Sequence, residues 1–163
     1  MLFRSPVLAV GGELKAAICL AADGRAVMSQ HIGDMGNVET LDALARAVDH
    51  LMRLFRVEPA AVAADLHPGY LSADWARRFA AKRGIPLVAV QHHEAHVAAL
   101  LAEHGRPFDG VIGVCFDGTG YGRDGTIQGG EFLVVARGAI SRDRKSTRLN
   151  SSHEWISRMP SSA

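Results

Sequence analysis

Apolar and polar positions in the first part of the chain predict three antiparallel strands in succession. An apolar run at residues 7–10 breaks at two glycines, and residues 14–21 resume it. Asp23 and Gly24 then make a two-residue hairpin signal, and residues 25–32 continue as a third strand. We therefore expect the chain to open with a three-stranded antiparallel meander.

Helical spacing follows the meander. Asn37 is a suitable N-cap, and Pro59 lies beyond the end of the pattern. Between them, apolar residues recur on one face at Leu41, Leu44, Val48, Leu51, Met52 and Phe55. This stripe predicts an amphipathic helix.

The next fifty residues alternate between short apolar runs and helical patterns. The runs lie at residues 61–64 and 86–91, and the helical patterns cover residues 72–83 and the stretch from His92 to Gly105. The predicted order is thus β-β-β-α-β-α-β-α. A meander followed by alternating strands and helices implies a mixed sheet with helices on its faces.

This order is similar to one lobe of the ribonuclease-H-like α/β fold, which the actin, sugar-kinase and Hsp70 ATPases use twice. Residues 110–116 and 131–136 resemble the opening hairpin of a second lobe. We therefore expect a first lobe over residues 1–107, a truncated second lobe over residues 108–141, and a non-native disordered tail over residues 142–163.

The tail is predicted from a break in composition. All 17 glycines occur by Gly138, whereas serine is concentrated from Ser141 onward. Residues 144–153 resemble the peptide obtained when sequencing-adapter DNA is translated, and such scars are excluded from fold reasoning. A natural basic tail is the alternative interpretation.

Composition describes an ordinary globular protein. Apolar residues make up 48% and charged residues 21%. The net charge of +1 gives no reason to expect nucleic acid or an anionic membrane as a partner. Cys19 and Cys115 lie far apart in apolar runs, which favours reduced core thiols. We expect a soluble cytoplasmic protein.

Two histidines carry the first candidate chemistry. His92 and His96 open a predicted helix four residues apart, so both imidazoles lie on one helical face and can share a metal ion. His93 and Glu94 point elsewhere on the helix and are expected to lie behind the metal site or in solvent. A lone histidine is more often structural, but this pairing favours a metal.

A glycine-dense turn carries the second candidate chemistry. It follows an apolar run, and such turns allow backbone N–H groups to close around phosphate oxygens. We expect phosphate contacts from Asp117, Gly118, Thr119, Gly120, Gly129 and Gly130. The corresponding turn of the first lobe contributes Gly11, Gly12 and Lys15. A loose hairpin without a ligand is the alternative.

Five blocks of sequence together resemble the HypF family of carbamoyltransferases, which mature [NiFe]-hydrogenases. They are Gly-Gly-Glu-Leu-Lys at 11–15, Ser-Gln-His-Ile-Gly-Asp at 29–34, Asp-Leu-His-Pro-Gly-Tyr at 65–70, Gln-His-His-Glu-Ala-His at 91–96 and Phe-Asp-Gly-Thr-Gly-Tyr-Gly-Arg-Asp-Gly-Thr at 116–126. The resemblance covers residues 1 to about 141. The family pattern has histidine, tryptophan and histidine where Glu94, Gln128 and Ala64 stand here.

The resemblance implies a reaction and its participants. Carbamoyl phosphate and ATP give carbamoyl-adenylate in an upstream domain, and the domain resembled here passes the carbamoyl group to the C-terminal cysteine of HypE. The implied cofactor is a divalent metal, zinc or iron, held by His92 and His96. In the family a further ligand is an aspartate of the second lobe, which we expect to lie past the end of this chain.

Two other functions fit part of the pattern. A small metallohydrolase using His92 and His96 would need a third protein ligand within the chain. A nucleotide-binding module without catalysis would need only the glycine turn. Because the second lobe is truncated, we expect the chain by itself to be catalytically silent.

Overall fold

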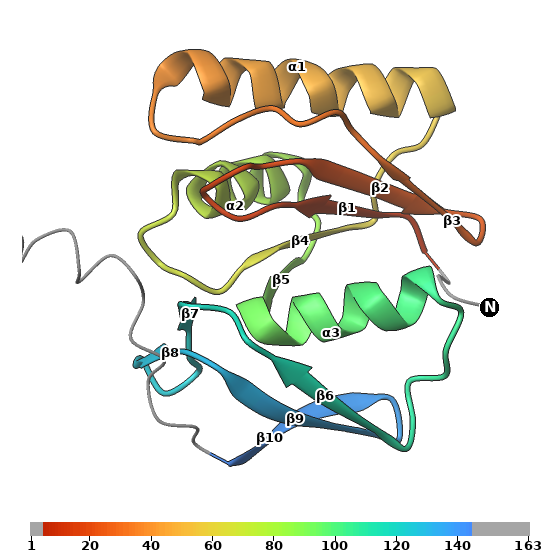
Figure 1. Ribbon diagram of the computed structural model, residues 1–163. Helices are drawn as coiled ribbons and strands as arrows, with labels where there is room; N and C mark the ends of the chain where they lie inside the picture. Colours follow the sequence, from red (N-terminus) through yellow and green to blue (C-terminus); the bar gives the residue numbers. More distant parts are fainter. Residues whose placement is uncertain (1–4, 145–163) are drawn as a thin grey trace, which may run out of the picture. The chain divides into compact units, whose positions relative to one another are not determined.

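The computed structural model describes residues 5–144 and divides the chain into two compact units between Val90 and Gln91 (Figure 1). The first unit contains the predicted mixed sheet, in the order β3-β2-β1-β4-β5. Pairing is antiparallel between β1, β2 and β3 and parallel between β1, β4 and β5. These strands are β1 (Val7–Val10), β2 (Ile18–Ala22), β3 (Arg25–Met28), β4 (Ala61–Asp65) and β5 (Leu87–Val90).

The predicted hairpin joins β2 to β3. Asp23 and Gly24 have φ values of 50° and 75°, the left-handed pair that a two-residue hairpin turn requires. Both strands are shorter than predicted, because residues 11–17 and 29–36 pair irregularly. Ala16, for example, forms an isolated bridge with Gly33 instead of extending the ladder.

Two helices of the first unit pack against the sheet face that carries Leu8 and Val62. Helix α1 (Val38–Phe55) begins as predicted, with the Asn37 side chain accepting a hydrogen bond from the Thr40 N–H at 2.9 Å. Helix α2 (Leu71–Arg83) ends as predicted at Gly84, which has φ of 64°. The buried core is formed by Leu8, Val10, Ile18, Leu20, Leu44, Val48, Val62, Ala76 and Phe79.

The second unit is a helix on a three-stranded antiparallel sheet of order β10-β9-β6. Its core consists of Val97, Leu101, Leu133 and Val135. A two-stranded hairpin, β7 with β8, stands beside it. The elements are α3 (His92–Glu103), β6 (Val111–Cys115), β7 (Gly120–Tyr121), β8 (Ile127–Gln128), β9 (Glu131–Ala136) and β10 (Ala139–Arg144).

Strand β10 corrects the predicted start of the tail. Residues 139–144 pair antiparallel with β9, so the strand continues past residue 142, where the tail was expected to begin. Glu131, 2% exposed, accepts two hydrogen bonds from the Arg142 guanidinium and ties the two strands together. The remainder of the predicted tail, residues 145–163, lies outside the described residues.

One face of this sheet packs against α3, and the other is apolar and exposed. Along β6, buried Gly113 and Cys115 alternate with Ile112, Val114 and, just beyond the strand, Phe116, which is 78% exposed. Both cysteines are free, Cys115 buried and Cys19 half-buried. Within residues 5–144, no helix combines the length and apolarity needed to cross a membrane.

Candidate metal centre

The start of helix α3 places the two predicted histidines together. Gln91 is the N-cap residue, and its side-chain oxygen accepts a hydrogen bond from the Glu94 N–H at 2.9 Å. The helix then brings His92 and His96 onto one face, with their Nε2 atoms 3.2 Å apart. The predicted histidine pair is therefore present in the structure.

Asp117 completes the group from the loop that follows β6. Its Oδ2 atom lies 2.7 Å from His92 Nε2 and 3.4 Å from His96 Nε2. Metal–nitrogen bonds of 2.0–2.1 Å at tetrahedral angles put donor atoms about 3.3 Å apart. Two of the observed separations, 3.2 and 3.4 Å, are close to that value, whereas the 2.7 Å between Asp117 Oδ2 and His92 Nε2 is a hydrogen-bond distance that would lengthen around an ion. The donor set thus fits a small divalent cation, and it resembles the two-histidine, one-carboxylate set of zinc and iron sites.

The Asp117 carboxylate is held ready to act as a ligand. Burial alone would raise its pKa, but the hydrogen bond from the Gly118 N–H and the nearby His92 and His96 lower the pKa below its usual value. The Gly118 N–H donates to Oδ1 at 2.7 Å, which leaves Oδ2 directed at the imidazoles. Asp117 is therefore an anion oriented by its own loop.

Asp117 bears on two expectations from the sequence. The third ligand was expected past the end of the chain, and Asp117 is a candidate within the chain, because it lies within reach of both histidines. The same residue was expected to contact phosphate, and both assignments stay predictions. The only sequence signal for its position was that it directly follows an apolar strand.

The residues between the histidines differ in their surroundings. His93 is fully buried, not solvent-facing, and burial together with neighbouring His92 lowers its pKa. Glu94 forms an ion pair with Arg123 of the β7–β8 hairpin, with 2.7 Å between Glu94 Oε2 and Arg123 Nη2. Helix α3 therefore contacts the glycine-rich β7–β8 hairpin through His93 and Glu94, a role that the sequence did not indicate.

Several glycines of the turn are needed for packing within the protein. A Cβ at Gly120 would lie 2.6 Å from His93 Cε1, and one at Gly122 would lie 2.2 Å from Gln128 Nε2. Gly129 and Gly130 are buried, whereas Thr119 is exposed. The space next to Gly120 and Gly122 is thus occupied by side chains of the protein, His93 and Gln128, where a phosphate was expected to approach the backbone. Phosphate binding by the turn stays a prediction.

The predicted turn of the first unit shows a similar mixture. A Cβ at Gly11 would lie 2.7 Å from the Ala17 carbonyl oxygen, so this glycine permits tight pairing of the chain, while Gly12 faces open space. Lys15 is exposed, with φ of 51°, and its N–H donates to Asp34 at 2.7 Å. Nucleotide contact by these residues is likewise still a prediction.

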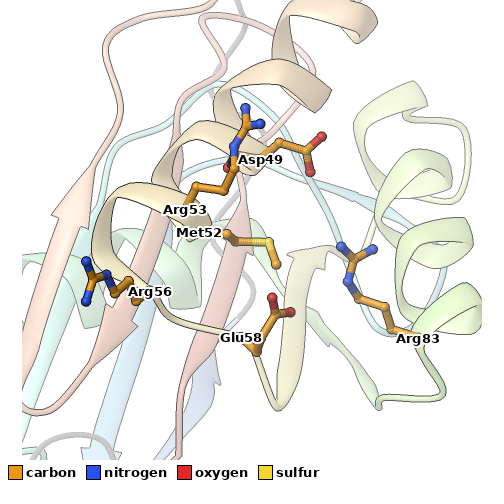
Figure 2. A pocket seen from close by; sticks show the side chains of 6 residues that line it. All are labelled: Asp49, Met52, Arg53, Arg56, Glu58 and Arg83. Carbon is orange, nitrogen blue, oxygen red and sulfur yellow. Dashed lines mark hydrogen bonds between the residues drawn. The ribbon is translucent and has the colours of Figure 1, made fainter.

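The first unit also contains a cavity of about 550 Å³, lined by Asp49, Met52, Arg53, Arg56, Glu58 and Arg83 (Figure 2). Arg53 and Arg83 lie in the last turns of α1 and α2, where a cation is favoured by the helix dipole. Two carboxylates, Asp49 and Glu58, offset part of the charge of the three arginines. The candidate metal ligands belong to the other unit.

Family models match nearly all of the described chain. Residues 3–103 match the HypF Kae1-like domain, and residues 113–151 match the second subdomain of the carbamoyltransferase Kae1-like domain. Carbamoyltransferase HypF2 of Cupriavidus necator is 50% identical over 136 residues, which cover 83% of this chain and 17% of that protein. The family division places α3 with the first subdomain, whereas its packing places it with the second unit.

Solved structures agree with the sequence match. HypF from T. kodakarensis is 39% identical, with a TM-score of 0.80, over 87% of this chain and 19% of that one. A full-length HypF in its phosphate- and nucleotide-bound form is 40% identical, with a TM-score of 0.77, over 85% of this chain and 18% of that one. The predicted fold class is confirmed. The chain spans less than a fifth of each of these relatives, and it belongs to the HypF family of carbamoyltransferases.

Proposed function

We propose that this chain provides the metal-binding part of a carbamoyl-transfer site in a longer HypF-type enzyme. The observation that carries the proposal is the convergence of His92 Nε2, His96 Nε2 and Asp117 Oδ2 within 4.8 Å. Two imidazoles and one carboxylate suit either zinc or iron. Membership of the carbamoyltransferase family supports the reaction class.

The proposed substrates follow from the family. Carbamoyl phosphate and ATP give carbamoyl-adenylate in another domain, and the thiolate of the C-terminal cysteine of HypE then attacks the carbamoyl carbon. A carbon–sulfur bond forms, the bond from carbon to the adenylate oxygen breaks, and AMP leaves with the electron pair. A bound divalent metal supplies polarisation of the carbamoyl oxygen at such a site.

Residues of this chain would hold the participants in place. Asp117 stays anionic at neutral pH, because the Gly118 N–H and the two histidines favour its charged form. Backbone N–H groups of the glycine turn, from Gly118 to Gly130, are proposed to contact the adenylate phosphate. The turn from Gly11 to Lys15, in the first unit, is proposed separately to contact a nucleotide phosphate. One solved relative holds phosphate and nucleotide, which supports this assignment.

A chimeric enzyme tests the function. Residues 3–141 of this chain would replace the matching segment of the C. necator HypF2, and transfer of labelled carbamoyl groups to HypE would be measured. We expect the chimera to transfer, and a His92→Ala, His96→Ala chimera to lose both bound metal and transfer. A His50→Ala chimera is the matched control, because His50 is exposed on α1. Unchanged transfer without both site histidines would refute the proposal.

The metallohydrolase alternative can no longer be set aside by counting ligands, since Asp117 is a candidate third ligand within the chain. Family membership favours transfer over hydrolysis. A chimera that releases carbamate from carbamoyl-adenylate without modifying HypE would favour the hydrolase, and one that binds nucleotide without either reaction would favour the binding module.

A further inference from the structure

We propose that Gln91 and Gln128 position Asp117 against the two histidines, and that this buried amide pair sets the affinity of the metal centre. The inference rests on the metal centre of the proposed function. It assigns a role to two side chains that would not themselves touch the metal or the substrate.

Gln91 joins the start of α3 to the glycine-rich hairpin. Its Oε1 accepts from the Glu94 N–H, which fixes the orientation of the amide. Its Nε2 therefore points the other way, where it donates to Gln128 Oε1 at 3.3 Å and lies 3.1 Å from His93 Nδ1. An amide nitrogen only donates, so His93 Nδ1 accepts and the ring proton is on Nε2. One side chain thus caps the helix, sets a tautomer and contacts the hairpin.

Gln128 connects this contact to Asp117. It pairs with Gly120 across the β7–β8 hairpin, and Gly120 follows Asp117 by three residues. Its own Nε2 donates to Asp124 Oδ1 at 3.4 Å, so both ends of the amide are used. The packing of Gly120 against the His93 ring limits how closely the hairpin can approach α3. The amide pair prevents separation, and the ring contact prevents closer approach.

A second connection between the same elements is weaker. Arg123 donates to both carboxylate oxygens of Glu94, but the Arg123 side chain is 62% exposed, and exposed ion pairs are screened by water and salt. Gln91 and Gln128 are only 4% and 8% exposed. Breaking their contact would leave buried polar atoms without hydrogen-bond partners, and water cannot readily reach these atoms to replace the lost bonds. We therefore assign the positioning role to the buried pair.

The test measures metal affinity in the whole 163-residue chain. A Gln128→Met variant keeps the approximate shape of the side chain and removes its hydrogen bonds. Titration with Co²⁺, followed by the absorption spectrum of the bound ion, should show binding at least about tenfold weaker than in the wild type. Losses of metal affinity on this scale are typical when a residue that supports a metal ligand is changed. The spectrum should also change, because Asp117 would no longer hold its position.

Two controls separate positioning from stability. Gln30→Met makes the same change at an exposed position, and Val135→Ala removes volume from the core of the second unit without touching the amide pair. Both should bind Co²⁺ as the wild type does, even if Val135→Ala unfolds at a lower temperature. An Arg123→Ala variant should weaken binding by less than Gln128→Met.

The outcomes are distinct. Wild-type affinity in Gln128→Met would overturn this inference and leave the metal centre standing. An equal loss in Val135→Ala would also overturn it, because the effect would then come from stability. No Co²⁺ binding by the wild type would overturn the proposed metal centre, and the positioning role with it.

Discussion

The contact between Gly113 of β6 and Val97 of α3 sets how closely helix and strand approach in the second unit. A Cβ at Gly113 would lie 2.6 Å from Val97 Cγ2 and 2.8 Å from Cγ1. Valine has one strongly preferred rotamer in a helix, so its methyl groups cannot turn aside. A Gly113→Ala variant must therefore push α3 away from the sheet.

The size of the effect follows from these distances. Overpacking of a core by a methyl group costs about 1–3 kcal/mol. Replacing glycine by alanine stabilises the folded state by about 0.4–1 kcal/mol, because alanine lowers the conformational entropy of the unfolded chain. The net loss for Gly113→Ala should thus be roughly 0–2.6 kcal/mol. Val97→Ala alone removes two buried methyl groups and should cost roughly 2 kcal/mol. In the double variant the new methyl group of residue 113 occupies the space vacated at residue 97. The double variant should therefore be more stable than the sum of the two single losses predicts.

Urea unfolding followed by far-UV circular dichroism would measure this double-mutant cycle. We expect a favourable coupling of about 1–2 kcal/mol between the two positions. On the proposed metal centre, Gly113→Ala should also weaken Co²⁺ binding, because α3 carries two of the candidate ligands and β6 leads to the third. The double variant should recover part of that loss. Additive effects of the two substitutions would refute this account of the packing.

Three further predictions concern the first unit. Leu44→Ala, at a fully buried position of α1, should lower the free energy of unfolding by about 2–5 kcal/mol in urea titrations. Asn37→Ala should cost about 1 kcal/mol in the same assay, because the Thr40 N–H loses its cap, whereas Asn37→Asp should keep most of the stability. Burial raises the pKa of the Cys19 thiol above its ordinary value, so the folded protein holds the thiol proton more tightly. The resulting stability is fully present below the ordinary thiol pKa and is lost as the pH rises through the raised pKa, and Cys19→Ala should flatten that decline.

Most of the first unit could be predicted because its signals are local. The Asp23–Gly24 turn, the Asn37 cap and the Gly84 stop each depend on the conformation of a few neighbouring residues, and the structure contains all three. Strand β10 was missed for the opposite reason. Its apolar residues end at Ile140, and the rest of the strand exists because β9 offers partners for its backbone. Such pairing depends on distant residues.

The candidate site shows the same division. The spacing of His92 and His96 is a local property of a helix, and it predicted their convergence correctly. Asp117 could not be assigned to them, because only the packing of α3 on β6 brings its carboxylate near. Glu94 and Gln128, two positions that depart from the family pattern, have hydrogen-bonded partners in Arg123 and Gln91. The spacing of residues in the sequence does not predict those partners either.

The three candidate ligands are neighbours in sequence as well as in space. Residues 92 to 117 contain the whole set, and only one strand intervenes between the second histidine and Asp117. Each doubling of a loop adds about 0.6 kcal/mol of closure entropy, so a ligand drawn from a remote segment would be costlier to bring in. A nascent chain leaving the ribosome carries all three ligands before any later segment is made. If the centre binds an ion as proposed, the bound ion favours the folded arrangement of α3 and β6 by mass action. The supply of metal would then bear on folding as well as on chemistry.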